Sequence, residues 1–429
     1  MSERKTTGVA ASGKTWAVRR LVTAATQPRT VLLCSLLFGL SYTLVEPTSI
    51  RRIVGEWTLS RSQVPIARQG SASNVGRPLD VTLVVDAVQA RLPRENLLLY
   101  RGPHGQPVPV QTPDDWSKRR RAIVEGMQSV MGQLPGAEKR CALNMQVVSA
   151  VQRPGYLEQL ITYQSEPGSR VPAYLLIPDS IRKQPAGKTP AVLCLHPTDN
   201  RIGHRVVIDS DARPNRQYAS ELAERGYVTL APSYPLLANY QPDLQSLGWE
   251  SGTLKAVWDN IRGLDLLESL PFVDARGFGC IGHSLGGHNA VYTAVFDDSI
   301  KVIVSSCGLD SYLDYYGGDE ARWLPEQGWC QTRYMPRLAD YRGRLEQIPF
   351  DFHEMIGALA PRHVMISAPL HDGNFQAASV DRIAKAAGAV YTLLGHPDRL
   401  RVEHPDCDHD FPIAIRQRAY QLFDEVLRR

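Results

Sequence analysis

The sequence predicts an α/β protein: a mostly parallel sheet of the eight-stranded type, with helices on both faces. From about residue 145 onward, short apolar runs alternate with segments of helical spacing, a pattern typical of parallel strands buried on both faces. A glycine-flanked serine, Ser284, lies between one such run and the helix after it. Polar loops containing Asp and His follow two later runs, at the strand ends where open α/β sheets bind ligands.

The expected elements follow from hydrophobic spacing and from turn residues. An antiparallel meander is expected over 145–152, 156–165 and 171–178. Parallel strands are expected over 191–196, 227–232, 277–282, 301–306 and 363–368, and 390–394 is expected to begin the last strand. Helices are expected over 116–131, 218–225, 253–270, 377–387 and 411–427, and after Leu285. The stretch 308–360 replaces a short connection and is expected to be a lid-like insertion.

The N-terminal residues are expected to precede the catalytic region. Residues 1–50 are basic and contain an apolar run, 30–45, which is short for a membrane span and suits a signal-peptide core. We interpret 1–50 as a signal peptide or signal anchor for export to the periplasm, the exterior or the envelope, with 30–45 as the membrane attachment if it is retained. The alternative is a disordered tail or a misassigned start codon. A linker and helical extension is expected over 51–140, and the catalytic domain over 141–429.

Charge and cysteine usage exclude several classes of function. Beyond residue 50 the numbers of basic and acidic residues are equal, so no nucleic-acid partner is expected. The run 118–121 is interpreted as a solvated helix face. The seven cysteines show no Cys-x-x-Cys and no His/Cys ligand spacing, so a zinc site is not expected. The predicted enzyme is independent of metals and cofactors. Cys141, Cys330 and Cys407 are candidates for disulfide pairing in an exported protein.

The serine lies in Gly282-His-Ser-Leu-Gly286, the only Gly-x-Ser-x-Gly in the chain. A serine held between a strand and a helix fits a nucleophile elbow, where side chains at 282 or 286 would collide with neighbouring elements. The alternative is a glycine-rich turn in which Ser284 only caps the helix.

A serine nucleophile needs a histidine base and a carboxylate that orients the base. Asp372 follows the run ending at Ala368, and His409 precedes the last helix, so the three occur in the order Ser, acid, His. The competing carboxylates are Asp310, Asp406, Asp408 and Asp410. His404 is the rival base, whereas His283 and His288 flank the elbow in positions that suit packing or substrate contacts.

An oxyanion hole needs two backbone N–H groups. Leu285 follows the nucleophile at a helix N-terminus and is the first candidate. The loop after His196 should supply the second, and since Pro197 has no N–H, Thr198 is the nearest residue that can donate.

The insertion is rich in aromatic residues, and we expect it to form one wall of the substrate pocket. Its rings are Tyr312, Tyr315, Tyr316, Trp323, Trp329, Tyr334 and Tyr341. Rings with polar tips suit a half-wet wall that stacks on sugars or ring-bearing acyl groups. Tyr315, Tyr316 and Trp323 are the predicted substrate-binding residues. The alternative is that these rings pack a small core of the insertion itself.

Residues from about 145 to the end resemble α/β-hydrolases of the dienelactone hydrolase and acetyl xylan esterase-like group. The resemblance rests on Gly282-His-Ser-Leu-Gly-Gly287, Ala368-Pro-Leu-His-Asp-Gly-Asn-Phe375 and Cys407-Asp-His-Asp-Phe-Pro412. It implies Ser284 as nucleophile, His409 as base and Asp372 as acid. Two positions depart from the group: Ser284 replaces the cysteine of true dienelactone hydrolases, and His196-Pro197 replaces the usual His-Gly of the oxyanion loop.

These observations predict a serine esterase that acts on small-molecule or carbohydrate esters through an acyl-enzyme. A peptidase of the prolyl-oligopeptidase-like type is the alternative within hydrolases, although the chain shows no propeller-type repeat. A non-catalytic binding protein on a hydrolase scaffold is the alternative outside them.

Overall fold

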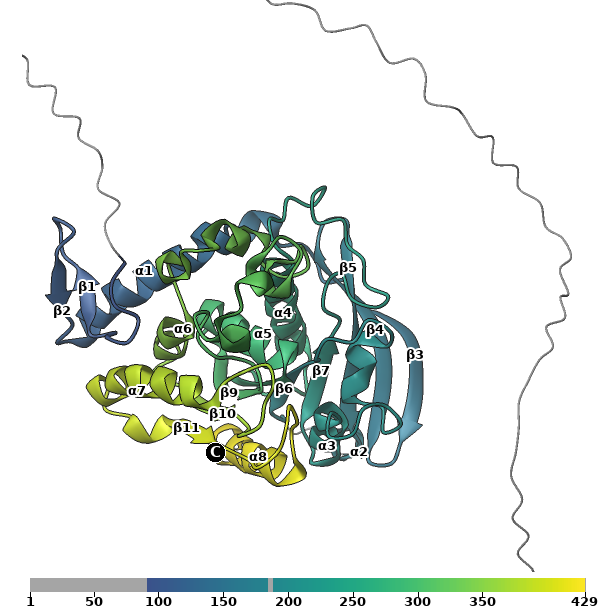
Figure 1. The fold of residues 1–429 in the computed structure, drawn as a ribbon. Helices are drawn as coiled ribbons and strands as arrows, with labels where there is room; N and C mark the ends of the chain where they lie inside the picture. The colour runs from purple at the N-terminus through teal and green to yellow at the C-terminus, as the bar shows by residue number, and fades with distance from the viewer. Residues whose placement is uncertain (1–90, 184–187, 429) are drawn as a thin grey trace, which may run out of the picture. The chain divides into compact units, whose positions relative to one another are not determined.

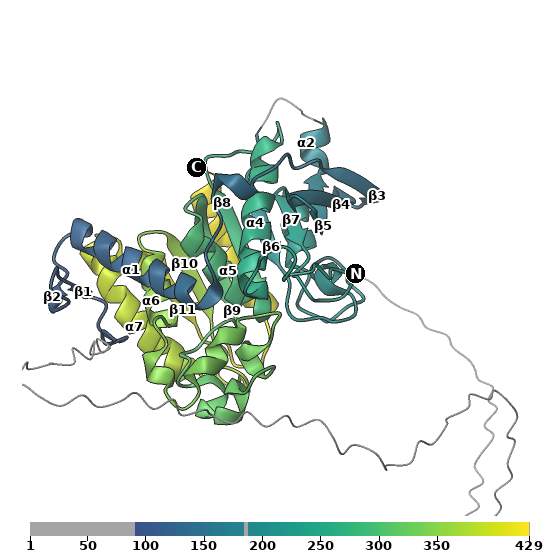
Figure 2. The same cartoon turned by 90° about the horizontal axis from the view of Figure 1, so that it is seen from above.

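A nine-stranded sheet forms the centre of the computed structural model, which describes residues 91–183 and 188–428 (Figure 1). The strand order is β11-β10-β9-β8-β6-β7-β5-β4-β3. The antiparallel strands are β3 (Gln146–Arg153), β4 (Tyr156–Glu166) and β5 (Ser169–Pro178), and β5 pairs antiparallel with β7. The parallel strands are β6 (Ala191–Leu195), β7 (Val228–Pro232), β8 (Phe278–His283), β9 (Ile300–Ser306), β10 (His363–Ser367) and β11 (Leu400–Glu403). In Figure 2, β3 and β4 lie at one edge of the sheet.

Helices cover both faces of this sheet, as expected. They are α1 (Pro113–Met131), α2 (Asp179–Lys183), α3 (Tyr218–Glu224), α4 (Gly252–Ser269), α5 (Leu285–Phe296), α6 (Phe352–Ala358), α7 (Ala377–Leu393) and α8 (Ile413–Leu427). Buried residues of α4, α5 and α7 join one hydrophobic cluster, and those of α3 and α8 join another. Strand β6 contributes Leu193 to the first cluster and Val192 and Cys194 to the second. This alternation places a hydrophobic layer on each side of the sheet.

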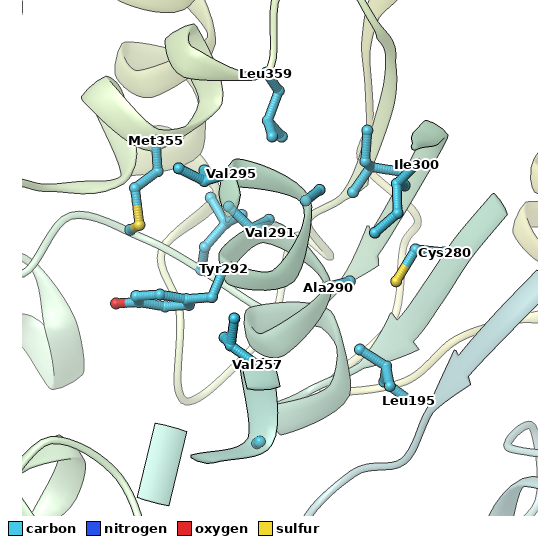
Figure 3. Packing of buried hydrophobic residues seen from close by; sticks show 14 of the residues in the cluster. Leu195, Val257, Cys280, Ala290, Val291, Tyr292, Val295, Ile300, Met355 and Leu359 are labelled. Atoms are coloured by element: carbon cyan, nitrogen blue, oxygen red, sulfur yellow. The ribbon is translucent and has the colours of Figure 1, made fainter. Parts of the chain in front are cut away.

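Helix α5 is buried almost along its whole length, and this fixes the position of Ser284, which immediately precedes it. Figure 3 shows Ala290, Val291, Tyr292 and Val295 of α5 surrounded by Leu195, Val257, Cys280, Ile300, Met355 and Leu359. A helix that is buried on all sides is held in place by the core around it, and each fully buried aliphatic side chain contributes about 1.5–3 kcal/mol. The start of α5 therefore has little freedom to move.

The expectation that 390–394 begins the last strand is wrong. Residues 390–393 form the last turn of α7, and the last strand is β11, over 400–403. Val390 and Tyr391 continue the helical spacing of Ile383 and Ala387 and are buried in the same cluster. Burial on this face outweighs the strand preference of β-branched and aromatic residues.

The interpretation of 118–121 as a solvated face is also incomplete. Arg119 is buried and forms an ion pair with Glu354 of α6 at 3.2 Å. Arg120 donates to the carbonyl oxygens of Val295 and Ala358. Together with buried Trp116, these contacts pack the helical part of the N-terminal extension directly on the core. The two short strands before α1, β1 (Leu99–Arg101) and β2 (Pro107–Pro109), form a separate antiparallel pair.

The expected targeting segment, 1–50, and the start of the linker lie outside the described residues. Within 91–183 and 188–428, no helix is both long and apolar enough to cross a membrane. The cysteines in these ranges, including Cys141, Cys330 and Cys407, are free thiols, so the disulfide candidates are not paired in this structure. The insertion 308–360 consists of short 3-10 helices and α6: η3 (Tyr315–Gly318), η4 (Glu320–Trp323), η5 (Gly328–Cys330), η6 (Pro336–Tyr341) and η7 (Leu345–Gln347).

Candidate active site

Ser284 occupies a strained turn between β8 and α5. Its φ and ψ are 55° and −121°, a conformation that costs a non-glycine residue on the order of 1–3 kcal/mol. A Cβ added to Gly282 would lie 2.2 Å from the backbone of Gly286, and one added to Gly286 would lie 2.0 Å from the Leu195 carbonyl oxygen. The expected collisions are therefore present. The Ser284 side chain makes no capping hydrogen bond to α5. The alternative role of Ser284 as a helix cap is therefore not supported.

Asp372 and His409 are hydrogen bonded to each other. His409 Nδ1 lies 3.0 Å and 2.9 Å from the two carboxylate oxygens of Asp372. The Asp372 Oδ1 atom also accepts hydrogen bonds from the backbone N–H groups of Asn374 (2.8 Å) and Phe375 (3.3 Å). The Asp372 side chain is 1% exposed and that of His409 is 26% exposed. A buried carboxylate therefore orients a half-buried imidazole that keeps access to solvent.

Three of the four competing carboxylates have other partners, and the fourth, Asp408, is exposed. Asp406 pairs with His371 at 2.8 Å, and Asp410 pairs with Arg216 at 2.5 Å. Asp310 is buried and accepts a hydrogen bond from the backbone N–H of Gln376, and its burial raises its pKa to about 8.

His404, the rival base, is engaged through both ring nitrogens. Nδ1 lies 2.7 Å from the Ala368 carbonyl oxygen and Nε2 lies 2.9 Å from Asp381. It does not line the pocket described below.

Ser284 and His409 line one pocket of about 920 Å³, near the upper end of the range for small-molecule sites. No hydrogen bond joins their side chains in the described part of the chain, and such contacts commonly tighten only when substrate binds. The other lining residues are Pro197, Thr198, Asp199, Asn200, Arg201, Ile202, Asp211, Ala212, Arg213, His283, Leu285, Tyr315, Tyr316, Arg322, Gln327, Gly328, Trp329, Gln331, Tyr334, Asn374 and Phe375.

Both predicted oxyanion residues lie at this pocket. Leu285 is the first residue of α5, where helix N–H groups have no partner within the helix. Thr198 follows His196, whose ring anchors the loop: Nε2 accepts a hydrogen bond from Tyr234 N–H at 2.9 Å, and Nδ1 lies 2.8 Å from the Pro197 carbonyl oxygen. Burial lowers the pKa of His196 to about 4, so the ring stays neutral and keeps both contacts near neutral pH.

The insertion forms one wall of the pocket, but not with every residue predicted. Tyr315 and Tyr316 line it, together with Trp329 and Tyr334. Trp323 does not: it is completely buried, with its ring 5.7 Å from that of Tyr312. For Trp323 the alternative interpretation, a ring in the insertion's own core, is the correct one.

The two histidines that flank the elbow have different environments. His283 lines the pocket, and its ring centroid lies 4.9 Å from that of His409. His288 is buried away from the pocket and stacks on Trp329 at 3.9 Å. It therefore supports the aromatic wall from behind.

Sequence reasoning missed several polar residues of the pocket, chiefly Asn374, Arg322, Arg201 and Arg213. Asn374 could have been predicted, because it lies two residues after Asp372 in the motif Ala368-Pro-Leu-His-Asp-Gly-Asn-Phe375. The arginines carry no comparable signal, because arginine is common on any surface loop.

One group of nearby metal-ligand side chains occurs in the described residues. Atoms of Cys307, Asp372 and His409 lie within 4.8 Å of one another. Burial raises the pKa of the Cys307 thiol well above its usual range, which disfavours the thiolate that a metal requires. Asp372 and His409 are moreover hydrogen bonded to each other, so we interpret the group as the acid–base pair with a buried thiol beside it.

Two family models match this chain. One, described as an abhydrolase family, matches residues 97–239, and one described as glucuronyl esterase of fungi matches 247–395. Among curated proteins, "Putative hydrolase YtaP" of Bacillus subtilis (strain 168) is 26% identical over 308 residues, which are 70% of this chain and 96% of that protein. The 4-O-methyl-glucuronoyl methylesterase 1 of Wolfiporia cocos is 24% identical over 185 residues, 40% of this chain and 45% of its own.

Solved structures show the same fold. A glucuronoyl esterase from Solibacter usitatus superposes with a TM-score of 0.60 at 20% identity, covering 77% of this chain and 96% of its own. A "putative acetyl xylan esterase" from Bacteroides fragilis gives a TM-score of 0.52 at 20% identity, covering 68% and 76%.

The chain therefore has the α/β-hydrolase fold. The hydrolase and esterase matches indicate a carboxylic ester hydrolase. The resemblance inferred from the three sequence motifs is confirmed.

Proposed function

We propose that the protein is a serine esterase that cleaves carboxylic esters of sugars, with Ser284 as nucleophile, His409 as general base and Asp372 as the acid that orients His409. The proposal is based mainly on Ser284, which has a strained backbone and makes no capping hydrogen bond. It lies in the same pocket as the His409 imidazole, which is hydrogen bonded to the buried Asp372 carboxylate. Strain of this kind persists where the surrounding structure enforces it, often at active sites.

The proposed reaction has two stages. His409 Nε2 takes the proton of Ser284 Oγ as the oxygen attacks the ester carbonyl carbon. The backbone N–H groups of Leu285 and Thr198 stabilise the oxyanion. His409 then gives its proton to the alkoxy oxygen, the C–O bond breaks, and the alcohol leaves an acyl-enzyme. Water then gives a proton to His409 as its oxygen attacks the acyl carbonyl carbon, and His409 returns that proton to Ser284 Oγ as the acyl C–O bond breaks. The products are an acid and an alcohol.

The pocket supports a sugar-sized substrate. It is larger than a short acyl group requires, and polar side chains such as Asp199, Asn200, Gln331 and Asn374 lie among rings that can stack on a sugar. The relatives named above act, by their names, on glucuronoyl esters and acetyl xylan. We favour esters of uronic acids over sugar acetates, since the glucuronyl esterase family model spans Ser284 and Asp372.

The test compares wild type with Ser284→Ala on a methyl ester of glucuronic acid, an acetylated xylose and p-nitrophenyl acetate. We expect the variant to fold and to lose turnover by ~10⁶, and the glucuronate ester to have the highest kcat/KM of the wild type. A folded variant that keeps a tenth of the activity contradicts Ser284 as nucleophile. Preference for the acetylated sugar contradicts only the uronate assignment.

We also propose export of the protein, based on the basic, apolar segment 1–50.

A further inference from the structure

The first residues of the insertion are hydrogen bonded to the loop that carries Asp372. Asp314 accepts hydrogen bonds from Gln376 Nε2 through its carbonyl oxygen and from Ser379 Oγ through its carboxylate, at 2.9 Å and 2.6 Å. Its carboxylate also pairs with Arg382 at 2.6 Å. These contacts join the pocket wall to the start of α7. They fix the distance between the wall and the loop that carries Asp372.

Tyr316 lies at the pocket end of this contact and is held from several sides. Its backbone is left-handed (φ 50°, ψ 38°), and Gly317 continues the turn with φ 72°. The Arg322 guanidinium lies 4.1 Å above the Tyr316 ring, and the Tyr315 ring packs edge-on at 4.8 Å. The hydroxyl donates a hydrogen bond to Asn374 Oδ1 at 2.8 Å. Backbone strain of this kind persists where the surrounding structure enforces it, and these contacts do so at Tyr316.

That hydrogen bond holds the Asn374 side chain against the pocket wall. The Asn374 Nδ2 atom lies 3.5 Å from His409 Nδ1, and the Asn374 backbone N–H donates to Asp372 Oδ1 at 2.8 Å. Asn374 therefore lies between Tyr316 and the Asp372–His409 pair, and the Tyr316 hydroxyl restrains the residue that contacts both members of the pair.

We propose that Tyr316 is a positioning residue that couples the substrate-binding wall to the Asp372–His409 pair by holding Asn374, which contacts both members of the pair. The inference rests on the proposed function for its roles of acid and base. Because Tyr316 also lines the pocket, a bound substrate that presses on its ring acts on the orientation of the base. The insertion then contributes to turnover as well as to binding.

Tyr316→Phe tests this, since it keeps the ring and the pocket wall and removes only the hydroxyl. Losing one hydrogen bond of ordinary strength corresponds to roughly a five- to tenfold fall in kcat on p-nitrophenyl acetate, with KM unchanged. A weaker Asp372–His409 contact stabilises the imidazolium less, so the acidic limb of the pH–rate profile should move to lower pH. Tyr341→Phe is the matched control: Tyr341 is in the same insertion but outside the pocket, and it should change neither quantity.

A double-mutant cycle with Asn374→Ala separates the coupling from a general effect on packing. In the Asn374→Ala background there is no amide to hold, so Tyr316→Phe should lower kcat no further. Equal effects of Tyr316→Phe in both backgrounds would overturn the proposal, and so would an unchanged kcat and pH profile in the single variant.

The His409–Asp372 hydrogen bond can also be followed by NMR in a Ser284→Ala background, where no turnover is needed. We expect Tyr316→Phe to change the resonance of the His409 Nδ1–H proton, and an unchanged resonance contradicts the coupling. Retained activity in Ser284→Ala contradicts the proposed function instead, so the two failures are distinguishable.

Discussion

Replacing Asp372 with Asn tests the proposed acid with a change of one atom. The backbone N–H groups of Asn374 and Phe375 point at Oδ1, so in Asp372→Asn the amide oxygen should remain there. The amide NH₂ group then takes the place of Oδ2, which lies 2.9 Å from His409 Nδ1. The NH₂ group donates to His409 Nδ1 and so favours the tautomer that carries its proton on Nε2. That tautomer cannot accept the Ser284 proton.

The expected loss in kcat is ~10⁴, the size seen when a triad histidine is held in the wrong tautomer. It corresponds to about 5.5 kcal/mol of transition-state stabilisation. The assay is kcat/KM on p-nitrophenyl acetate, with a thermal melt showing that the variant folds. Asp408→Asn is the matched control, because Asp408 adjoins His409 but is exposed, and its loss should be less than tenfold. The assignment of Asp372 is refuted if Asp372→Asn keeps a tenth of wild-type activity. It is also refuted if Asp408→Asn loses as much activity as we expect for Asp372→Asn.

Two further predictions concern the insertion and the N-terminus. Trp323→Ala should lower the free energy of unfolding by about 3–5 kcal/mol, because the ring is fully buried, and leave the ranking of esters unchanged. Trp329→Ala should change that ranking, since Trp329 lines the pocket. Denaturant melts measure the free energy of unfolding, and the ester panel measures the ranking. An altered ranking in Trp323→Ala would contradict the prediction. Deletion of 1–50 should leave a soluble, active enzyme, and fractionation of cells should place the full-length protein outside the cytosol. Unprocessed, cytosolic protein would contradict export.

The sheet and its helices were largely predictable, because they depend on local hydrophobic spacing. The runs expected over 191–196, 277–282 and 301–306 are strands of the structure within one or two residues. The exception is 390–394, where strand propensity and helical spacing disagreed, and packing on the core decided for the helix.

Burial of charged and aromatic side chains could not be predicted in the same way. Arg119 appears in a run of basic residues that reads as a solvated face, yet Glu354, more than two hundred positions away, neutralises it inside the protein. Trp323 and Trp329 are equally aromatic, and only the path of the insertion places one in its core and the other on the pocket wall.

The sequence by itself determined the candidate nucleophile, acid and base, because each depends on a residue type at a fixed place relative to a strand end. The glycines around Ser284 belong to the same local chemistry. Only the tertiary structure decided what surrounds these groups: the Tyr316–Asn374 contact, the wall of rings and the partners of the competing carboxylates. Such contacts join residues that are distant along the chain, and no spacing within one segment encodes them.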